Sequence, residues 1–261
     1  MKAKFAEYIT YFMYSLITIL ILLTMLILVD WLNWEPKYSL PLKTPPEQSE
    51  EIRQATPAKK SSTGGIVRAE VPFTAQAPFW NWGDIIYEEW CEEASIIMAV
   101  SWSRWQRLTA TWANAEIKNI SNFEKDLFWN FLDTSVYDTA KAMKGYFNFT
   151  QYKIIEKVTK KDIIDSLGNW NILVVPVYWR DLKNPNFTQP GPIAHMLVVT
   201  WYDPLKKQFI TNDPWTKNWK SYRYGEDVLY NAIWAYPSSA TEHKLPAKIG
   251  RAKTIIEVYK K

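Results

Sequence analysis

The only cysteine of the chain lies where a helix is expected to begin, and a thiol at that position could act as a nucleophile. From Ala94 onward the apolar residues recur at the i, i+3, i+4 spacing of a helix that faces a core, and Glu92 and Glu93 suit a positive helix N-terminus. Backbone N–H groups point outward there and the dipole favours an anion, so Cys91 would lose its proton more easily. The alternative is that Cys91 is a small buried hydrophobic residue, as free cysteines often are.

A histidine and an aspartate fall side by side in a predicted β-hairpin. His195 opens the apolar strand 195–202, residues 203–207 have turn chemistry, and the return strand 208–213 is stopped by Pro214. If the hairpin folds about residue 205, position 195 lies opposite about 215, so Asp213 is within one or two residues of His195. An imidazole beside a carboxylate is the base-plus-orienter half of a Cys-His-Asp arrangement. The alternative is a structural pair, and the spacing does not say whether Cys91 reaches His195.

The elements that would position these residues indicate an α+β fold. Helices are expected from Cys91 to about 107, at 113–119, 122–131, 136–146 with a cap at 133–135, and 160–167 with Thr159 as cap. Extended segments are expected at 69–73, 149–155, 172–179, 194–202 and 208–212. Helices that precede antiparallel strands are typical of α+β domains. Pro176, inside an apolar strand, predicts an edge strand or a bulge.

The first quarter of the chain is predicted to be an anchor and a tether. After a tail at 1–8, residues 9–29 are uncharged and mostly apolar, and at about 1.5 Å per residue they would just cross a bilayer core of roughly 30 Å. We expect a single transmembrane signal-anchor helix at 9–32, with the bulk of the chain outside the cytoplasmic membrane. Residues 33–68 are rich in Pro, Ser and charges and read as a flexible tether. The globular domain is expected at 69–240, followed by a C-terminal extension at 241–261.

Composition excludes several classes of function. The net charge is +4 and the basic residues form no stripe, so a nucleic-acid partner is not indicated. One cysteine and two histidines, His195 and His243, do not have metal-ligand spacing, and there is no Gly-rich phosphate loop. We therefore expect no metal and no cofactor. The oligomeric state is not indicated by the sequence.

Four motifs in order resemble the C39-like (peptidase C39 type 2) cysteine peptidase family. They are Val71-Pro72-Phe73-Thr74-Ala75-Gln76, Cys91-Glu92-Glu93-Ala94-Ser95, Gly191-Pro192-Ile193-Ala194-His195-Met196-Leu197-Val198 and Asn212-Asp213-Pro214. The resemblance covers roughly residues 69–240, with further similar stretches at 133–135, 138–141 and 222–224. It implies a papain-like fold, in which the helical half carries the cysteine and the antiparallel sheet carries the histidine and the aspartate.

Carried over residue by residue, the resemblance implies Cys91 as nucleophile, His195 as general base and then acid, and Asp213 as orienter. Gln76 matches the glutamine whose side-chain amide, with the Cys91 backbone N–H, would stabilise the oxyanion. Because Gln76 stands 15 residues before Cys91, the intervening loop would have to double back. Without the family, Gln76 would be a polar loop residue.

Other residues depart from the family pattern or surround the thiol. Trp201 and Trp215 stand where glycine is expected, and each could narrow the cleft or form a binding platform. Four glutamates, Glu88, Glu89, Glu92 and Glu93, crowd the thiol and by themselves would raise its pKa. They could rim a cleft that favours basic substrate segments, but solvated or salt-bridged side chains are the favoured interpretation.

The sequence thus predicts a membrane-anchored extracytoplasmic cysteine peptidase that hydrolyses peptide or isopeptide bonds in a peptide or protein substrate. One alternative is a catalytically silent papain-fold module whose Trp-rich loops at 79–90 and 215–219 bind cell-wall glycan or peptide. A further alternative is an enzyme with the same thiol chemistry but a different substrate, either a hydrolase of cell-wall peptides or an acyl transferase.

Overall fold

The computed structural model describes residues 13, 15–20, 24–25, 70–79, 85–185, 191–215, 220–239 and 252–260. The chain divides into two compact units, 1–49 and 50–261. In the first unit residues 15–20 are helical, and the rest of the expected anchor at 9–32 lies almost wholly outside the described residues, as does the tether at 33–68. Within the described ranges no helix is both long and apolar enough to cross a membrane.

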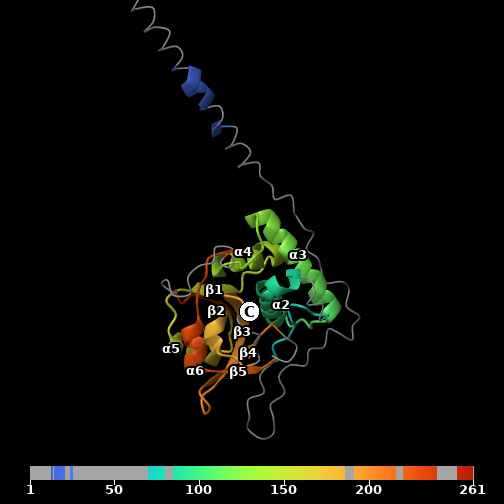
Figure 1. The fold of residues 1–261 in the computed structure, drawn as a ribbon, viewed down its shortest axis with the longest axis vertical. Coiled ribbons are helices and arrows are strands. Elements are labelled where there is room, and N and C mark those ends of the chain that lie inside the picture. The colour runs from blue at the N-terminus through green and yellow to red at the C-terminus, as the bar shows by residue number, and fades with distance from the viewer. Residues whose placement is uncertain are drawn as a thin grey trace, which may run out of the picture. The chain divides into compact units, whose positions relative to one another are not determined.

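The second unit is built on one antiparallel sheet of six strands in the order β1-β6-β2-β3-β4-β5 (Figure 1). The strands are β1 (Tyr152–Ile155), β2 (Ile172–Tyr178), β3 (Ala194–Asp203), β4 (Gln208–Asn212), β5 (Tyr222–Gly225) and β6 (Ile255–Val258). β2 and β3 lie at the centre, and every residue of β2 is buried. A strand that is covered on both faces needs such a continuous apolar run.

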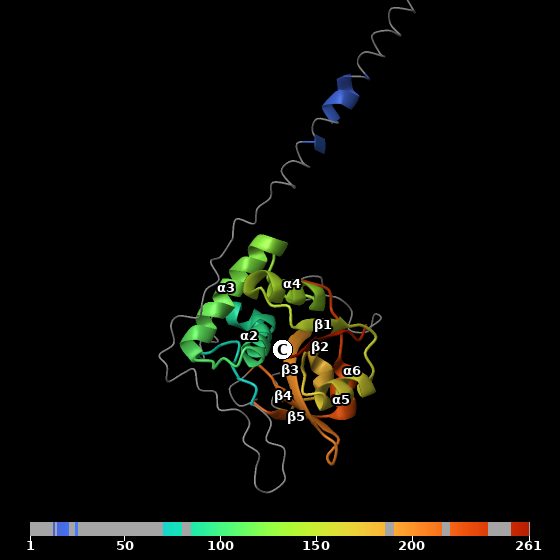
Figure 2. The same ribbon diagram turned by 180° about the vertical axis from the view of Figure 1, so that it is seen from behind.

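Helices cover both faces of this sheet. They are the 3₁₀ helix η2 (Ile85–Glu89), α2 (Cys91–Ser103), α3 (Ala110–Phe128), α4 (Val136–Phe147), α5 (Lys160–Gly168), the 3₁₀ helix η3 (Trp179–Leu182) and α6 (Glu226–Ala232). The two opposite views place α2, α3 and α4 together on one side, and α5 and α6 on the other (Figures 1 and 2). The domain therefore has a helix–sheet–helix arrangement with two cores.

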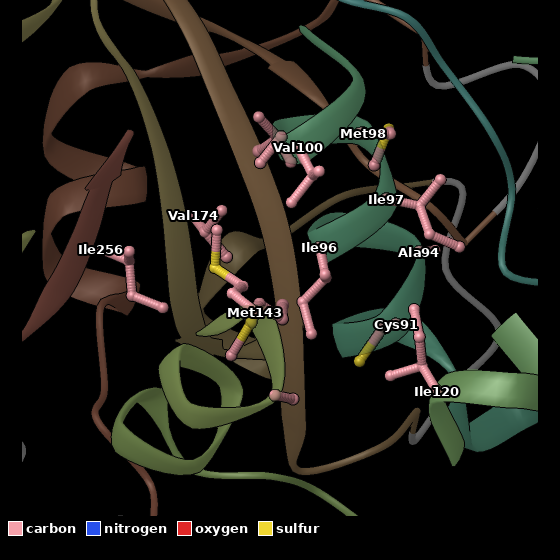
Figure 3. Packing of buried hydrophobic residues seen from close by; sticks show 14 of the residues in the cluster. Cys91, Ala94, Ile96, Ile97, Met98, Val100, Ile120, Met143, Val174 and Ile256 are labelled. Atoms are coloured by element: carbon pink, nitrogen blue, oxygen red, sulfur yellow. The ribbon is translucent and has the colours of Figure 1, made fainter. Parts of the chain in front are cut away.

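Side-chain alternation along β3 divides those two cores. Met196 and Val198 pack in the cluster that contains α2, whereas Leu197 and Val199 pack in the cluster with α5 and α6. Successive side chains of a strand point to opposite faces, so alternate residues of β3 belong to the two different cores. In Figure 3, Ile96 and Val100 of α2 point toward the strands from the first of these cores.

Two helix starts that were predicted from their caps are confirmed. The Ser135 hydroxyl accepts from the backbone N–H of Asp138 at the start of α4. At the start of α5, Thr159 and Asp162 form a reciprocal capping box. Such side chains satisfy N–H groups that have no partner within the helix, which is why they mark helix starts in a sequence.

Several other elements differ from the sequence-based expectation. Residues 70–73 of the expected first strand are not in a strand, and the two helices expected at 113–119 and 122–131 are one continuous helix, α3. The expected C-terminal extension at 241–261 includes β6, which lies inside the sheet between β1 and β2. The mixture of helices and antiparallel sheet that the sequence predicts is confirmed.

Pro176 is not on an edge strand, because β2 lies between β6 and β3. The pairing of β2 with β6 includes Ile172, Leu173 and Val174 only, and therefore ends before Pro176. Beyond that point the backbone N–H of Trp234 donates to the Pro176 carbonyl. A residue without an N–H is tolerated here because the β6 ladder has already ended.

Candidate active site

Cys91 is the first residue of α2, as the sequence predicts, but its thiol is buried. The residue is 6% exposed, and its Sγ lies 3.0 Å from Oε2 of Glu92. Figure 3 shows the side chain at the first turn of α2, beside Ile120 of α3. One turn further along α2, the Ser95 hydroxyl donates to the Met196 carbonyl at 3.3 Å, which ties this end of the helix to the start of β3.

The surroundings of the thiol favour its protonated form. Burial is the largest influence, and together with the neighbouring carboxyl of Glu92 it holds the pKa of Cys91 well above its ordinary value. Asp133 adds negative charge from the segment between α3 and α4, while the backbone N–H of Met196 acts in the opposite direction and favours the thiolate. In this arrangement the helix N-terminus does not by itself make Cys91 acidic.

His195 and Asp213 form the pair that the hairpin predicts. The Nε2 of His195 lies 2.8 Å from Oδ1 of Asp213, and both side chains are almost completely buried. In the observed register Val198 pairs with Asn212 and Asp203 with Gln208, with a bulge between Val199 and Trp201. Continuing that register places Asp213 diagonally across from His195 on the same face, within reach of its ring.

Three groups hold this pair in place. The Tyr224 hydroxyl donates to Oδ2 of Asp213 at 2.9 Å, and the backbone N–H of Trp215 donates to Oδ1 at 3.2 Å. The Trp179 ring packs edge-on against the imidazole, with centroids 4.4 Å apart. These contacts fix the carboxylate and the ring together, so that Asp213 can orient the imidazole and stabilise it when it is charged.

The structure does not bring Cys91 into hydrogen-bonding contact with His195. The Nδ1 of His195 is buried and has no hydrogen-bond partner among the described residues, and the thiol contacts Glu92 instead. His195 and Leu197 share one face of β3, whereas Cys91 packs in the cluster on the other face, beside Met196. The start of α2 is therefore tied to the first residues of β3, but the thiol of Cys91 and the imidazole of His195 are not joined.

Gln76 lies beside the segment that leads into α2. Its Nε2 donates to the carbonyls of Tyr87 and Glu88, at 2.9 and 3.0 Å, and its backbone N–H donates to the Pro214 carbonyl at 2.8 Å. Gln76 therefore lies beside the segment just before Cys91, as the oxyanion role implied by the resemblance would need. Both amide hydrogens are engaged with backbone carbonyls, and the oxyanion role of Gln76 stays a prediction.

Glu92 and Glu93 are not solvated, contrary to the favoured interpretation of the sequence. Both are buried, because helices and sheet surround α2 on all sides. Glu92 accepts from the Tyr236 hydroxyl at 2.6 Å through Oε1, and Glu93 accepts from the Ser121 hydroxyl at 2.7 Å. Burial, and then the nearby Asp133 and Glu93, hold the pKa of Glu92 well above its ordinary value.

Two buried carboxyl groups lie next to each other between α2 and α3. Glu93 and Glu124 are both fully buried and interact with each other. Burial raises the pKa of Glu93 to about 7, and burial and then the charge of Glu93 hold the pKa of Glu124 well above its ordinary value. Because two ionised carboxylates would repel in such a site, we expect the pair to hold a proton in the folded chain, on Glu124 in preference to Glu93.

The two tryptophans that depart from the family pattern lie in different places. Trp215 packs against Trp179 with ring centroids 4.3 Å apart, and its centroid is 6.4 Å from that of His195. Trp201 instead lies near Trp170, at 6.2 Å. Only Trp215 therefore lies close enough to the histidine to shape this site.

No group of three or more metal-ligating side chains occurs in the part of the chain that the structure describes. A cavity of about 490 Å³ lies at the other end of α2 from Cys91, with Trp102, Trp105 and Lys260 in its lining. It is separate from the site at Cys91 and His195.

Two contributors to the site were missed in the sequence. Tyr236, which holds Glu92, carries no pattern that singles it out. Tyr224 lies in a stretch that the family resemblance includes, but its bond to Asp213 depends on the pairing of β5 with β4, and β5 was not expected.

Comparisons with known proteins bear on residues 68–241, which match the model of the Peptidase_C39 like family. A candidate C39-like peptidase from Bacillus anthracis, known from a crystal structure, is similar at 12% identity with a TM-score of 0.48. The alignment covers 73% of this chain and 95% of that one. The sequence matches none of the curated proteins.

Proposed function

Because the chain belongs to the Peptidase_C39 like family, we propose that it is a cysteine peptidase with Cys91 as nucleophile, His195 as general base and Asp213 as orienting carboxylate. The observation that carries the proposal is the buried His195–Asp213 hydrogen bond of 2.8 Å at the start of β3, the strand to which the first turns of α2 are tied. A fixed imidazole whose Nδ1 has no hydrogen-bond partner within the described ranges is suited to take a proton from a thiol that reaches it.

The proposed reaction begins with transfer of the Cys91 proton to Nδ1 of His195. The thiolate attacks the carbonyl carbon of the scissile bond, and the carbonyl electrons move onto oxygen. The backbone N–H of Cys91 and the amide of Gln76 are the proposed donors to that oxyanion. The imidazolium then protonates the leaving amine, and water attacks the acyl-enzyme with His195 again as base, which regenerates the thiol.

Hydrolysis of a labelled protein tests this proposal directly. We expect the purified full-length chain to release fluorescent peptides from labelled casein, and we expect Cys91→Ala and His195→Ala to abolish the release. His243→Ala removes the only other histidine and is the matched control, which should retain activity. If Cys91→Ala cleaved as fast as the unsubstituted protein, the proposal would be wrong.

A silent binding module is the second candidate, and the buried thiol favours it. Cys91 is 6% exposed and burial raises its pKa, which is typical of a structural cysteine. In that case the chain would bind cell-wall glycan or peptide without turnover. Co-sedimentation with purified cell wall tests it: retention that Cys91→Ala leaves unchanged, with no casein or wall peptide released, would support the module.

The location is also proposed, from the sequence. Residues 9–32 would anchor the chain in the lipid bilayer, with the peptidase domain outside the cytoplasmic membrane and peptide or isopeptide bonds of extracellular or cell-wall proteins as substrates. Protease added to intact cells should degrade the domain, and alkaline carbonate should leave the chain in the membrane pellet. A chain that carbonate releases would contradict the anchor.

A further inference from the structure

The buried Glu92 is a titratable group that the proposed reaction does not use, although it is in direct contact with the nucleophile. One carboxyl oxygen, Oε2, lies 3.0 Å from Sγ of Cys91, and the other, Oε1, accepts from Tyr236 at 2.6 Å. Glu92 is 1% exposed, so the carboxyl is held between two fixed partners rather than moving in solvent.

While the thiol is bonded to Glu92, it does not donate to His195. His195 has Nε2 on Asp213 and a buried Nδ1 without a partner in the part of the chain that the structure describes, and that nitrogen is the atom that must receive the thiol proton. An unsatisfied buried polar atom costs free energy, so the arrangement persists only if the thiol has a better partner elsewhere. Glu92 is that partner.

We propose that Glu92 is a positioning residue that holds Cys91 in a resting state: it takes the thiol hydrogen bond that His195 needs, and the peptidase becomes active when Sγ exchanges Glu92 for Nδ1. This inference rests on the proposed function. In the exchange the S–H proton passes to Nδ1, which gives a thiolate beside an imidazolium whose Nε2–H already faces Asp213. Glu92 keeps its bond from Tyr236 and neither gains nor loses a proton.

The charged and titratable groups that act on the thiol come from three segments. They are Glu92 on α2 itself, Asp133 on the segment between α3 and α4, and Tyr236 on the segment after α6. Glu93 is adjacent in sequence but turns toward Ser121 and Glu124. It therefore serves as a matched control, being a second buried glutamate of the same helix turn that does not contact Sγ.

The pH dependence of Cys91 alkylation by iodoacetamide tests the inference, and the chain's only cysteine makes the signal specific. In Glu92→Gln we expect the midpoint of the rate profile to move down by at least about one pH unit, which is a roughly tenfold higher rate below the midpoint. Glu93→Gln should leave the midpoint near that of the unsubstituted protein. Tyr236→Phe removes the hydrogen bond that lowers the pKa of Glu92, so residue 92 stays neutral to a higher pH. This variant should move the midpoint in the same direction by less, and it replaces Glu92→Gln if that variant does not fold.

The double variant Glu92→Gln/His195→Ala separates this inference from the proposed function. Loss of the gained reactivity in the double variant would support both. If the midpoint is lower in Glu92→Gln and equally low in the double variant, Glu92 does restrain the thiol but His195 does not act on it. That result would support this inference and contradict the proposed Cys–His pair. An unchanged or raised midpoint in Glu92→Gln would overturn the inference, and loss of all reactivity would do so too, since Glu92 would then be the base itself.

Discussion

The Tyr224 hydroxyl donates a hydrogen bond of 2.9 Å to Oδ2 of Asp213, the oxygen that does not face His195. Both side chains are buried, and Tyr224 comes from β5, at the edge of the sheet. The carboxylate that bonds to the imidazole is therefore fixed by a strand that carries none of the proposed catalytic residues. Burial, and then the Asp213 charge, raise the pKa of Tyr224 far above its ordinary value, so the phenol remains a donor.

Tyr224→Phe should destabilise the domain by about 1–3 kcal/mol, because it leaves a buried carboxylate oxygen without its side-chain donor. Urea unfolding of the full-length chain measures this change. Tyr222→Phe is the matched control: it removes a hydroxyl that donates to Asn184 from a less buried position on the same strand, and should cost less. Equal losses in the two variants would contradict a special role for the bond to Asp213.

Gln76→Ala should lower the free energy of unfolding by about 1–3 kcal/mol, since the Tyr87 and Glu88 carbonyls would lose their donor. The oxyanion role makes a separate prediction, a fall in kcat of roughly 10²–10³-fold. Unfolding curves and casein turnover measured on the same preparation distinguish them. A loss of stability with unchanged kcat would leave Gln76 as an anchor of the segment before α2 and remove it from the oxyanion site.

Stability should fall as the pH rises across the range in which Glu93 ionises. Its pKa is raised in the folded state, to about 7 from an ordinary 4.5, so the folded chain binds more protons than the unfolded chain between these values. The protonated Glu93–Glu124 pair contributes fully to the free energy of unfolding below about pH 4.5, and this contribution is lost as the pH rises toward about 7. Urea midpoints measured between pH 5 and 8 follow this loss.

Glu124→Gln should flatten that pH dependence, because the amide can donate to Glu93 and removes the like charge. Glu116→Gln, on a more exposed position of α3 where Tyr146 donates to it, is the control and should keep the slope of the unsubstituted protein. Parallel profiles in Glu124→Gln and the unsubstituted protein would contradict the shared proton.

The sequence predicts the His195–Asp213 pair well because both residues belong to one hairpin with a short turn. Alternation and the turn residues determine the register to within two positions, and the bulge near Thr200 changes it by only one. The helix starts at Cys91 and Thr159 are equally local, since a cap or a break in the hydrophobic pattern lies next to each.

The environment of the thiol is not predictable in the same way, because its partners are distant in sequence. Tyr236 is 144 residues from Glu92, and β6 reaches the sheet from beyond the expected end of the domain. Glutamates beside a helix start ordinarily face water. Only the enclosure of α2 by α3, α4 and β3 makes Glu92 and Glu93 buried groups, and that enclosure is a property of the tertiary fold.

The most direct test of the central claim is the pH dependence of Cys91 alkylation in the full-length chain with and without His195. The account predicts that His195→Ala lowers the rate at pH 7 by at least about tenfold, since about one pKa unit or more of thiolate stabilisation would be lost, while His243→Ala leaves the profile unchanged. Identical profiles with and without His195 would contradict the Cys–His pair and leave the binding module as the better account.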